Sequence, residues 1–321
     1  MLEDKKKVLF LRFSSLGDIV IANYSAMMIK KKHPAFHLTW MTDALYAGIV
    51  RAQPWVDDVI EWDRKRTGNR GYCEILRKVR HMGFDILVDM HATDRSSLFS
   101  LLSGIPKRYA EHGYNWPLAH TNIGLGGLLG DCPNIGTCRK YLYTPTLNND
   151  IAGLCRKGYK KLGLAIGASS VVKRWPVRRW IEFCSIASDS GYDMFLIGNG
   201  QDELEAAETI ISEVGSRHVI NVVGRTSITD TVALTAQMNV VVAGDTGIMH
   251  IARALGIPVV GLFGPNQPMV GEEYMKSIGL LYFCECPDRG CQKKECSRQC
   301  LEDIPASVVW DGIRKIIGGI D

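Results

Sequence analysis

Two successive alternations of short apolar strand patterns and helical patterns predict an α/β fold of two doubly wound, Rossmann-like domains that face each other across a cleft. The chain has 321 residues, of which 46% are hydrophobic, and it can therefore bury two cores of about 150 residues each. Pro145 and the polar residues 148–150 interrupt every regular pattern. The sequence therefore predicts domains at residues 1–150 and 151–321.

The first domain is expected to open with a buried strand at residues 8–11, where four apolar residues stand together. A turn of small residues follows, and the apolar spacing after it predicts a helix over residues 19–32 that Pro34 ends. Further strands are expected at residues 36–41, 59–62 and 84–90, and further helices at residues 71–82 and up to residue 103. Residues 116–136 contain Gly and Pro with little periodicity, which predicts a long loop.

The second domain repeats the alternation. Its strands are expected at residues 162–166, 193–197, 219–223, 240–242 and 258–263. Its helices are expected at residues 177–188, 202–214, 227–238 and 248–255, and a final helix at residues 307–317 is expected to pack back on the first domain. Ligands of doubly wound sheets bind at the carboxyl ends of the strands, so the turns after these strands form the candidate site.

The turn at residues 245–247 lies where a strand gives way to a helix, whose free N–H groups and positive dipole end suit phosphate. Neither G-x-G-x-x-G nor G-x-x-x-x-G-K-[ST] occurs, which argues against a dinucleotide fingerprint and a P-loop. There is also no Asp-x-Asp pair, so helix dipoles with Lys or Arg are favoured over a divalent metal for holding a diphosphate.

Asp18 stands at the start of the first expected helix and has two interpretations. It could be an N-cap or first-turn acid, which stabilises a helix by about 1 kcal/mol. It could also be a carboxylate at the edge of a cleft that takes a proton from a hydroxyl. Spacing alone favours the cap.

Seven basic residues and one acidic residue stand between positions 64 and 80, and part of this run is the solvated face of the expected helix. Arg64, Lys65 and Arg66 precede that helix in a Gly-containing loop, where they could bind phosphates or carboxylates of a substrate. Residues 1–150 hold 20 Lys or Arg against 15 Asp or Glu, so an acidic partner would meet this half. An ordinary solvated surface explains the excess equally well.

Four motifs stand in order along the chain: S-S-L-G-D at residues 14–18, K-R-W-P-x-x-x-W at 173–180, D-T-G-x-x-H-x-A-x-A-L-G at 245–256 and P-V-V-G-L-F-G-P-x-x-P at 258–268. With these motifs the chain resembles glycosyltransferase family 9, the ADP-heptose:lipopolysaccharide heptosyltransferases, nearly from end to end. The resemblance implies the GT-B architecture, with the acceptor on the first domain and the sugar nucleotide on the second. It also implies inverting transfer of heptose from ADP-heptose to an acidic acceptor such as the inner core of lipopolysaccharide, without a metal or other cofactor in catalysis.

The resemblance assigns roles by motif. Asp18 would be the general base that deprotonates the acceptor hydroxyl, which raises that interpretation above the cap. Lys173 would lie on the diphosphate, and Asp245 would bind hydroxyls of the transferred sugar. The N–H groups of Thr246 and Gly247 would hold the diphosphate. His250 could assist the phosphates or be a solvated side chain, and both remain open.

Two other functions remain open: transfer of heptose or a related sugar to a protein or another glycan, and a non-catalytic protein that binds a sugar nucleotide. No nucleic-acid partner is expected. No apolar run approaches the roughly 18 residues of a spanning helix, and the N-terminus lacks the apolar region of a signal peptide. We therefore expect a cytoplasmic location, with peripheral contact to the inner face of the cytoplasmic membrane through a glycolipid acceptor.

Five of the ten cysteines fall in the segment 284–300, at positions Cys284, Cys286, Cys291, Cys296 and Cys300. Disulfides are disfavoured in a reducing compartment. Thiolates at this spacing could bind zinc or iron in a closed structural site, or they could be scattered thiols without a metal.

Overall fold

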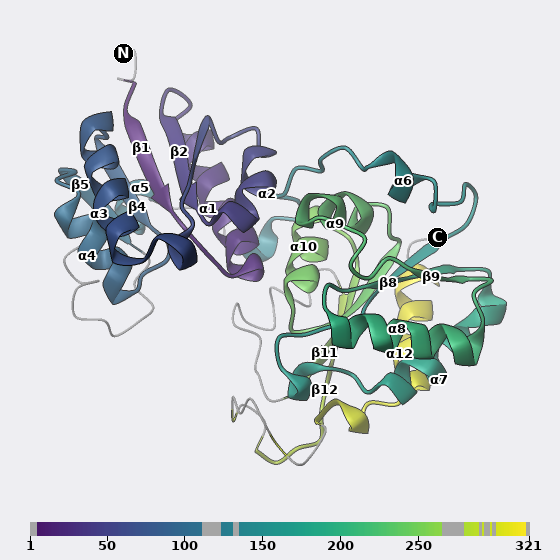
Figure 1. The fold of residues 1–321 in the computed structure, drawn as a ribbon. Helices are drawn as coiled ribbons and strands as arrows, with labels where there is room; N and C mark the ends of the chain where they lie inside the picture. The colour runs from purple at the N-terminus through teal and green to yellow at the C-terminus, as the bar shows by residue number, and fades with distance from the viewer. Residues whose placement is uncertain are drawn as a thin grey trace. The chain divides into compact units, whose positions relative to one another are not determined.

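The computed structural model describes residues 5–110, 123–130, 135–264, 279–288, 291, 296 and 300–318, apart from the side chains of residues 64–67 and 69. The chain divides into two compact units. The first contains Met1–Asn134 and Tyr141–Tyr143, and the second contains Ile135–Lys140 and Thr144–Asp321. Each unit is a parallel α/β sheet with helices on both faces, which confirms the predicted fold class (Figure 1).

The first unit has a six-stranded parallel sheet in the order β3-β2-β1-β4-β5-β6. Its strands are β1 (Lys7–Leu11), β2 (His37–Thr42), β3 (Asp58–Glu61), β4 (Ile86–Asp89), β5 (Lys107–Ala110) and β6 (Ile123–Gly124). Its helices are α1 (Leu16–Lys32), α2 (Ala47–Arg51), α3 (Arg64–Met82), α4 (Asp94–Leu102) and α5 (Gly126–Leu129). Leu9, Phe10 and Trp40 are fully buried because helices cover both faces of such a sheet.

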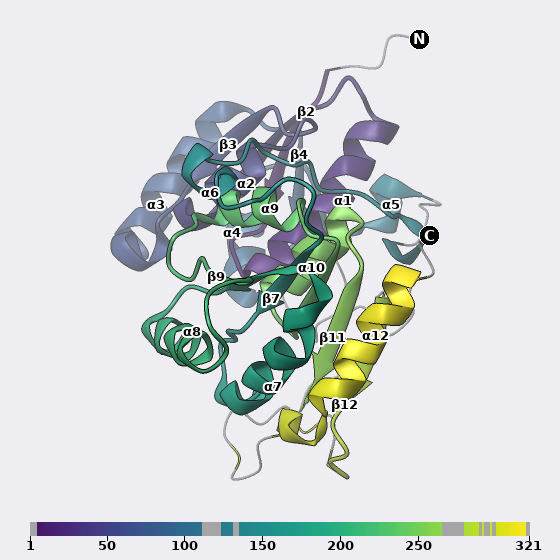
Figure 2. The same cartoon turned by 90° about the vertical axis from the view of Figure 1, so that its right-hand side faces the viewer.

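The second unit repeats this design in a six-stranded sheet of order β9-β8-β7-β10-β11-β12. Its strands are β7 (Lys161–Ala165), β8 (Asp193–Ile197), β9 (Val219–Asn221), β10 (Val240–Gly244), β11 (Val259–Phe263) and β12 (Gly279–Phe283). Its helices are α6 (Asn149–Ala152), α7 (Val177–Ala187), α8 (Gln201–Val214), α9 (Ile228–Thr235), α10 (Gly247–Leu255) and α12 (Ala306–Gly318). Helices α8, α7 and α12 form one layer over the sheet, and α9 and α10 lie together in another (Figure 2).

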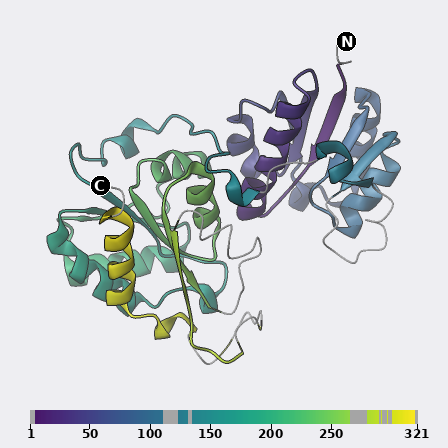
Figure 3. The same ribbon diagram turned by 180° about the vertical axis from the view of Figure 1, so that it is seen from behind.

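The final helix α12 lies in the second unit (Figure 3). Its buried residues Val309 and Ile313 belong to the core that contains Trp180 and Phe183 of α7. The apolar face that we expected to pack on the first domain is therefore covered by α7 and by strands β11 and β12. Among the residues that the structure describes, no helix combines the length and apolar character needed to cross a membrane.

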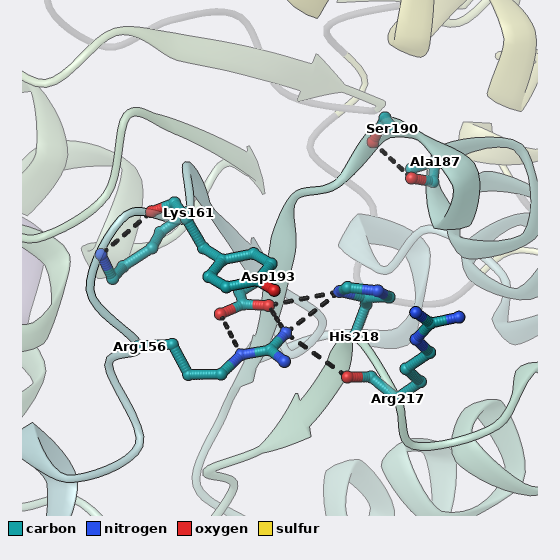
Figure 4. A network of polar contacts seen from close by, with 8 residues as sticks. Arg156, Lys161, Ala187, Ser190, Asp193, Arg217 and His218 are labelled. Carbon is teal, nitrogen blue, oxygen red and sulfur yellow. Dashed lines mark hydrogen bonds and ion pairs between the residues drawn. The ribbon is translucent and has the colours of Figure 1, made fainter.

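An ionic network around the buried Asp193 ties the start of the second sheet together (Figure 4). Asp193, at the beginning of β8, is fully buried, and its Oδ2 accepts a hydrogen bond from Arg156 Nε at 2.8 Å. Nη2 of the same guanidinium bonds Asp193 Oδ1 and lies 3.0 Å from His218 Nδ1. The network lies at the amino ends of β8 and β9, away from the carboxyl ends where ligands of such sheets bind, so we assign it to stability.

Candidate active site

The strand order of each sheet reverses at a switch point, where doubly wound sheets bind their ligands. In the first unit β1 and β4 are neighbours, with Leu11 beside Asp89 at their carboxyl ends. In the second unit β7 and β10 are neighbours, with Ala165 beside Ala243. Asp18 lies in the first turn of α1, which follows β1, and Asp245 directly follows β10, so the main candidates from the sequence lie at these two sheet edges.

The Asp18 carboxylate is held by one of its two oxygens. Helix α1 starts after Ser15, whose backbone N–H and hydroxyl both donate to Asp18 Oδ2 at 2.9 Å. Arg12 Nη2 lies 2.6 Å from the same Oδ2. Within the described part of the chain, no hydrogen bond or ion pair reaches Oδ1 of this carboxylate. Capping the helix and accepting a proton are therefore compatible, because they use different oxygens.

Asp18 is ionised at neutral pH. Burial, the largest contribution, raises its pKa, but the positive charge of Arg12 and the hydrogen bonds from Ser15 and Arg12 outweigh it, and the pKa lies below the ordinary 3.8. The side chain remains 27% exposed. A charged and partly exposed carboxylate can accept a proton from a bound hydroxyl.

Lys173 and Asp245 meet at the switch point of the second unit. Lys173 ends the 3-10 turn η4 (Val171–Lys173), and its Nζ lies 2.8 Å from Asp245 Oδ2. Two residues further on, Trp175 buries its ring and donates from Nε1 to the carbonyl of Ile304 at 3.0 Å. The basic turn is therefore fixed by a buried aromatic anchor, and its ammonium points to the end of β10.

Two glycines let the η4 turn cross the sheet edge, and sequence analysis did not identify them. A Cβ on Gly244, the last residue of β10, would lie 2.8 Å from the carbonyl oxygen of Lys173. A Cβ on Gly264, after β11, would lie 3.0 Å from the carbonyl oxygen of Val172. Backbone contacts this close leave no room for a side chain. In the sequence these glycines can be recognised because each stands at the end of a buried apolar run, and the two runs follow one another along the chain.

Helix α10 begins at the same edge. Thr246 is its N-cap in an extended conformation, and Gly247 is its first residue. The first N–H groups of a helix lack partners within the helix, and the dipole makes this end positive. His250 is only 8% exposed, so the interpretation of a solvated histidine is wrong.

The three basic acceptor candidates Arg64, Lys65 and Arg66 lie in helix α3, so the prediction of a loop at this position is wrong. The structure accommodates Gly68 as a kink in that helix, with φ of 54°. Since their side chains lie outside the described residues, their role in acceptor binding stays a prediction.

Four of the five cysteines of the segment 284–300 lie near the fifth, Cys300. Cys284 and Cys300 are buried, whereas Cys291 and Cys296 are exposed. Burial raises the pKa of the Cys300 thiol, and its four neighbouring thiols raise it further. Among the described residues, no group of three or more His, Cys, Asp or Glu side chains is placed to hold a metal ion. A structural zinc or iron site therefore has no support from the geometry and stays a prediction.

The fold belongs to the class of GT-B glycosyltransferases. The chain is similar to the structure of E. coli ADP-heptose lps heptosyltransferase II, with a TM-score of 0.77 and 19% identity over 98% of this chain and 99% of that one. At this level of identity the likeness establishes the fold.

Comparison with known sequences identifies the family within this class. The chain belongs to glycosyltransferase family 9 (heptosyltransferase), whose model matches residues 143–302. It is 24% identical to the lipopolysaccharide core heptosyltransferase OpsX of Haemophilus influenzae, over 83% of this chain and 81% of the relative. It is 32% identical to lipooligosaccharide heptosyltransferase 2 of Haemophilus ducreyi, over 54% of this chain and 49% of that protein. The protein is therefore a glycosyltransferase.

Proposed function

We propose that the protein transfers heptose from ADP-heptose to an acidic acceptor such as the inner core of lipopolysaccharide, with inversion and without a catalytic metal. The observation that carries the proposal is that the match to family 9 covers most of the unit in which Lys173 pairs with Asp245 beside a helix N-terminus. The names of the relatives support the sugar and the acceptor, since both are heptosyltransferases of lipopolysaccharide or lipooligosaccharide. The name of the similar solved structure supports the donor.

The proposed reaction is a single displacement. The acceptor hydroxyl gives its proton to Asp18 Oδ1 while its oxygen attacks the anomeric carbon of the heptose. The bond between that carbon and the diphosphate oxygen breaks, and ADP leaves with the electron pair. Attack from the face opposite the leaving group inverts the anomeric configuration.

The second unit would stabilise the departing charge. The Lys173 ammonium is a compact cation that can bind a diphosphate oxygen. The N–H groups of Thr246 and Gly247 stand at the positive end of α10 and would bind the same diphosphate. Asp245 would bind hydroxyls of the heptose, and its pairing with Lys173 holds both side chains at one place. These groups could balance the diphosphate charge without a divalent ion.

On the acceptor side, we propose that Arg64, Lys65 and Arg66 attract an anionic glycolipid at the cytoplasmic face of the membrane. Guanidinium groups bind phosphate and carboxylate by paired hydrogen bonds.

A calorimetric screen of nucleoside diphosphates and their sugars tests the donor. ADP-heptose is expected to bind more tightly than ADP, and ADP more tightly than UDP or GDP, with the same affinities in the presence of a chelator. Tighter binding of UDP or GDP would remove the donor assignment, and binding that requires a divalent ion would remove the metal-independent mechanism.

Gly244→Ala tests the close approach of the η4 turn to β10. The new methyl group would push the Lys173 carbonyl away, at a cost of about 1–3 kcal/mol for overpacking. If this cost falls on the binding-competent form, ADP should bind about 5- to 150-fold more weakly, as measured by calorimetry. Gly153→Ala is the control, because a Cβ there meets only ordinary contacts at 3.5 Å or more. Equal ADP affinity in the two variants would contradict the role of the turn.

A further inference from the structure

We propose that Arg12 is a positioning residue for the transfer reaction: it holds Asp18 by Oδ2 and so presents Oδ1 to the acceptor hydroxyl. The inference rests on the proposed role of Asp18 as the base and extends it to the residue that sets the orientation of the base. It concerns the first unit alone.

Arg12 is fixed by three hydrogen bonds, two to β2 and one to the end of β4, the strands on either side of β1. It follows β1, and its backbone N–H donates to the carbonyl of Met41 in β2 at 3.3 Å. Its own carbonyl accepts a hydrogen bond from Trp40 Nε1 at 3.1 Å. Its guanidinium donates through Nη1 to the carbonyl of Met90, directly after β4. With a side chain only 14% exposed, Arg12 has little freedom to move.

The guanidinium therefore bridges the two strands of the switch point. One nitrogen, Nη1, is bound at the end of β4, and the other, Nη2, lies 2.6 Å from Asp18 Oδ2. A planar guanidinium presents its donors in a fixed fork, so fixing one nitrogen fixes the direction of the other. Asp18 is thus aligned relative to the sheet edge and not only to its own helix.

A second carboxylate stabilises the turn after β4 to which the Arg12 guanidinium is bound. Asp89, the last residue of β4, is fully buried, and its Oδ1 accepts hydrogen bonds from the N–H groups of His91 and Ala92 at 3.0 Å each. Ala92 has φ of 47°, which non-glycine residues rarely adopt, and the two bonds to Asp89 hold the turn in that form. Met90, which receives Arg12, lies in this turn. Burial raises the pKa of Asp89, and the charge of Arg12 acts in the opposite direction.

A capping acid elsewhere in the chain shows what Arg12 adds. Asp230 caps helix α9 in the same way as Asp18 caps α1: the N–H and hydroxyl of Ser227 both donate to its Oδ2, at 3.2 and 2.6 Å. No ion pair to Asp230 is present among the described residues. The capping box alone therefore does not require an arginine, and the contact of Arg12 with Asp18 is additional to helix capping.

The experiment compares Arg12→Met and Arg12→Lys with the wild-type protein in a transfer assay with ADP-heptose and a lipopolysaccharide acceptor. Arg12→Met removes both the charge and the fork. We expect kcat to fall by about 10²-fold, within the range of general-base catalysis, while the affinity for ADP-heptose stays within twofold. Arg12→Lys keeps a charge but loses the fork, so kcat should fall while the acid limb of the pH profile stays in place.

The pH profile separates positioning from a purely structural role. In the wild-type protein the pKa of Asp18 lies below 3.8, so kcat/KM should stay level as the pH falls until it approaches that low value. Without Arg12 the raising effect of burial is no longer offset by its charge, so the acid limb should move to higher pH in Arg12→Met. Among the described residues that pack at this edge, the other titratable groups are Asp89 and His91, which packs on Phe13.

Arg51→Met is the matched control, because Arg51 pairs with Glu61 on the exposed surface of the same unit. This substitution should change neither kcat nor the pH of the acid limb. Unchanged kcat and an unchanged acid limb in Arg12→Met would overturn the inference. If Arg12→Met does not fold, as judged by thermal denaturation, wild-type kcat in Arg12→Lys would overturn it in the same way. Transfer that survives in Asp18→Asn would instead remove the proposed function of Asp18.

Discussion

Asp18→Asn is expected to lower the rate of heptose transfer by about 10²–10⁴-fold, the range of general-base catalysis. The amide has the shape of the carboxylate and can still accept from Ser15, but its oxygen cannot take up a proton from the acceptor hydroxyl. Affinity for ADP-heptose should remain within twofold, because the donor is assigned to the other unit. Both quantities can be measured on one preparation, by acceptor-dependent release of ADP and by calorimetry.

Asp230→Asn provides the matched control for Asp18→Asn. Both residues cap a helix through a serine three positions earlier, so both substitutions weaken a cap by a similar amount, about 1 kcal/mol. Only Asp18 stands at a switch point. If the two variants lose transfer equally, the effect of Asp18→Asn is a loss of stability, and the assignment of the base fails.

Lys173→Met is expected to weaken ADP-heptose binding by roughly 10- to 150-fold, since hydrogen bonds to charged groups contribute about 1.5–3 kcal/mol. The substitution removes the cation that would bind the diphosphate and leaves Asp245 without its lysine. The rate of transfer should fall further than the affinity, because the charge on the diphosphate grows as the bond to the sugar breaks.

Lys161→Met is the control for this variant. Lys161 begins β7, at the amino end of the second sheet, and its Nζ donates to the nearby carbonyl of Tyr159. It should bind ADP-heptose like the wild-type protein. An affinity of Lys173→Met equal to that of Lys161→Met would contradict the placing of the diphosphate at Lys173.

The fold could be predicted because its signals are local. A short run of β-branched residues such as the one in Val240–Gly244, which is buried along its whole length, predicts a strand of a parallel sheet. The apolar residues of the following helix α10 recur at helical spacing and so predict its buried face. The repeated alternation of strands and helices is then compatible with only a few chain topologies. The membership of glycosyltransferase family 9 is confirmed by the match to residues 143–302.

The contacts that complete each site could not be predicted, because they join residues far apart in the sequence. Arg12 meets Met90 across 78 positions, and no spacing rule connects them. Gly244 matters because the backbone of Lys173 crosses it, although 71 positions separate the two residues. Each contact exists only once the sheet has brought two strand ends together.

The start of helix α3 at Arg64 shows that a local sequence pattern can give a wrong prediction. Gly68 and the dense positive charge predicted a loop, since glycine and like charges destabilise a helix. Helix α3 instead begins at Arg64 and accommodates the glycine as a kink at which the backbone leaves helical angles. A glycine inside a helical pattern can thus mark a bend as well as an end.

In the proposed mechanism the first unit supplies the base and the second unit holds the leaving diphosphate. The most direct test measures, for Asp18→Asn and Lys173→Met side by side, the dissociation constant of ADP-heptose and the rate at which heptose reaches the acceptor. We predict that Asp18→Asn binds the donor like the wild-type protein and barely transfers it, whereas Lys173→Met loses affinity as well as rate. Weakened donor binding in Asp18→Asn with unchanged binding in Lys173→Met would contradict the account.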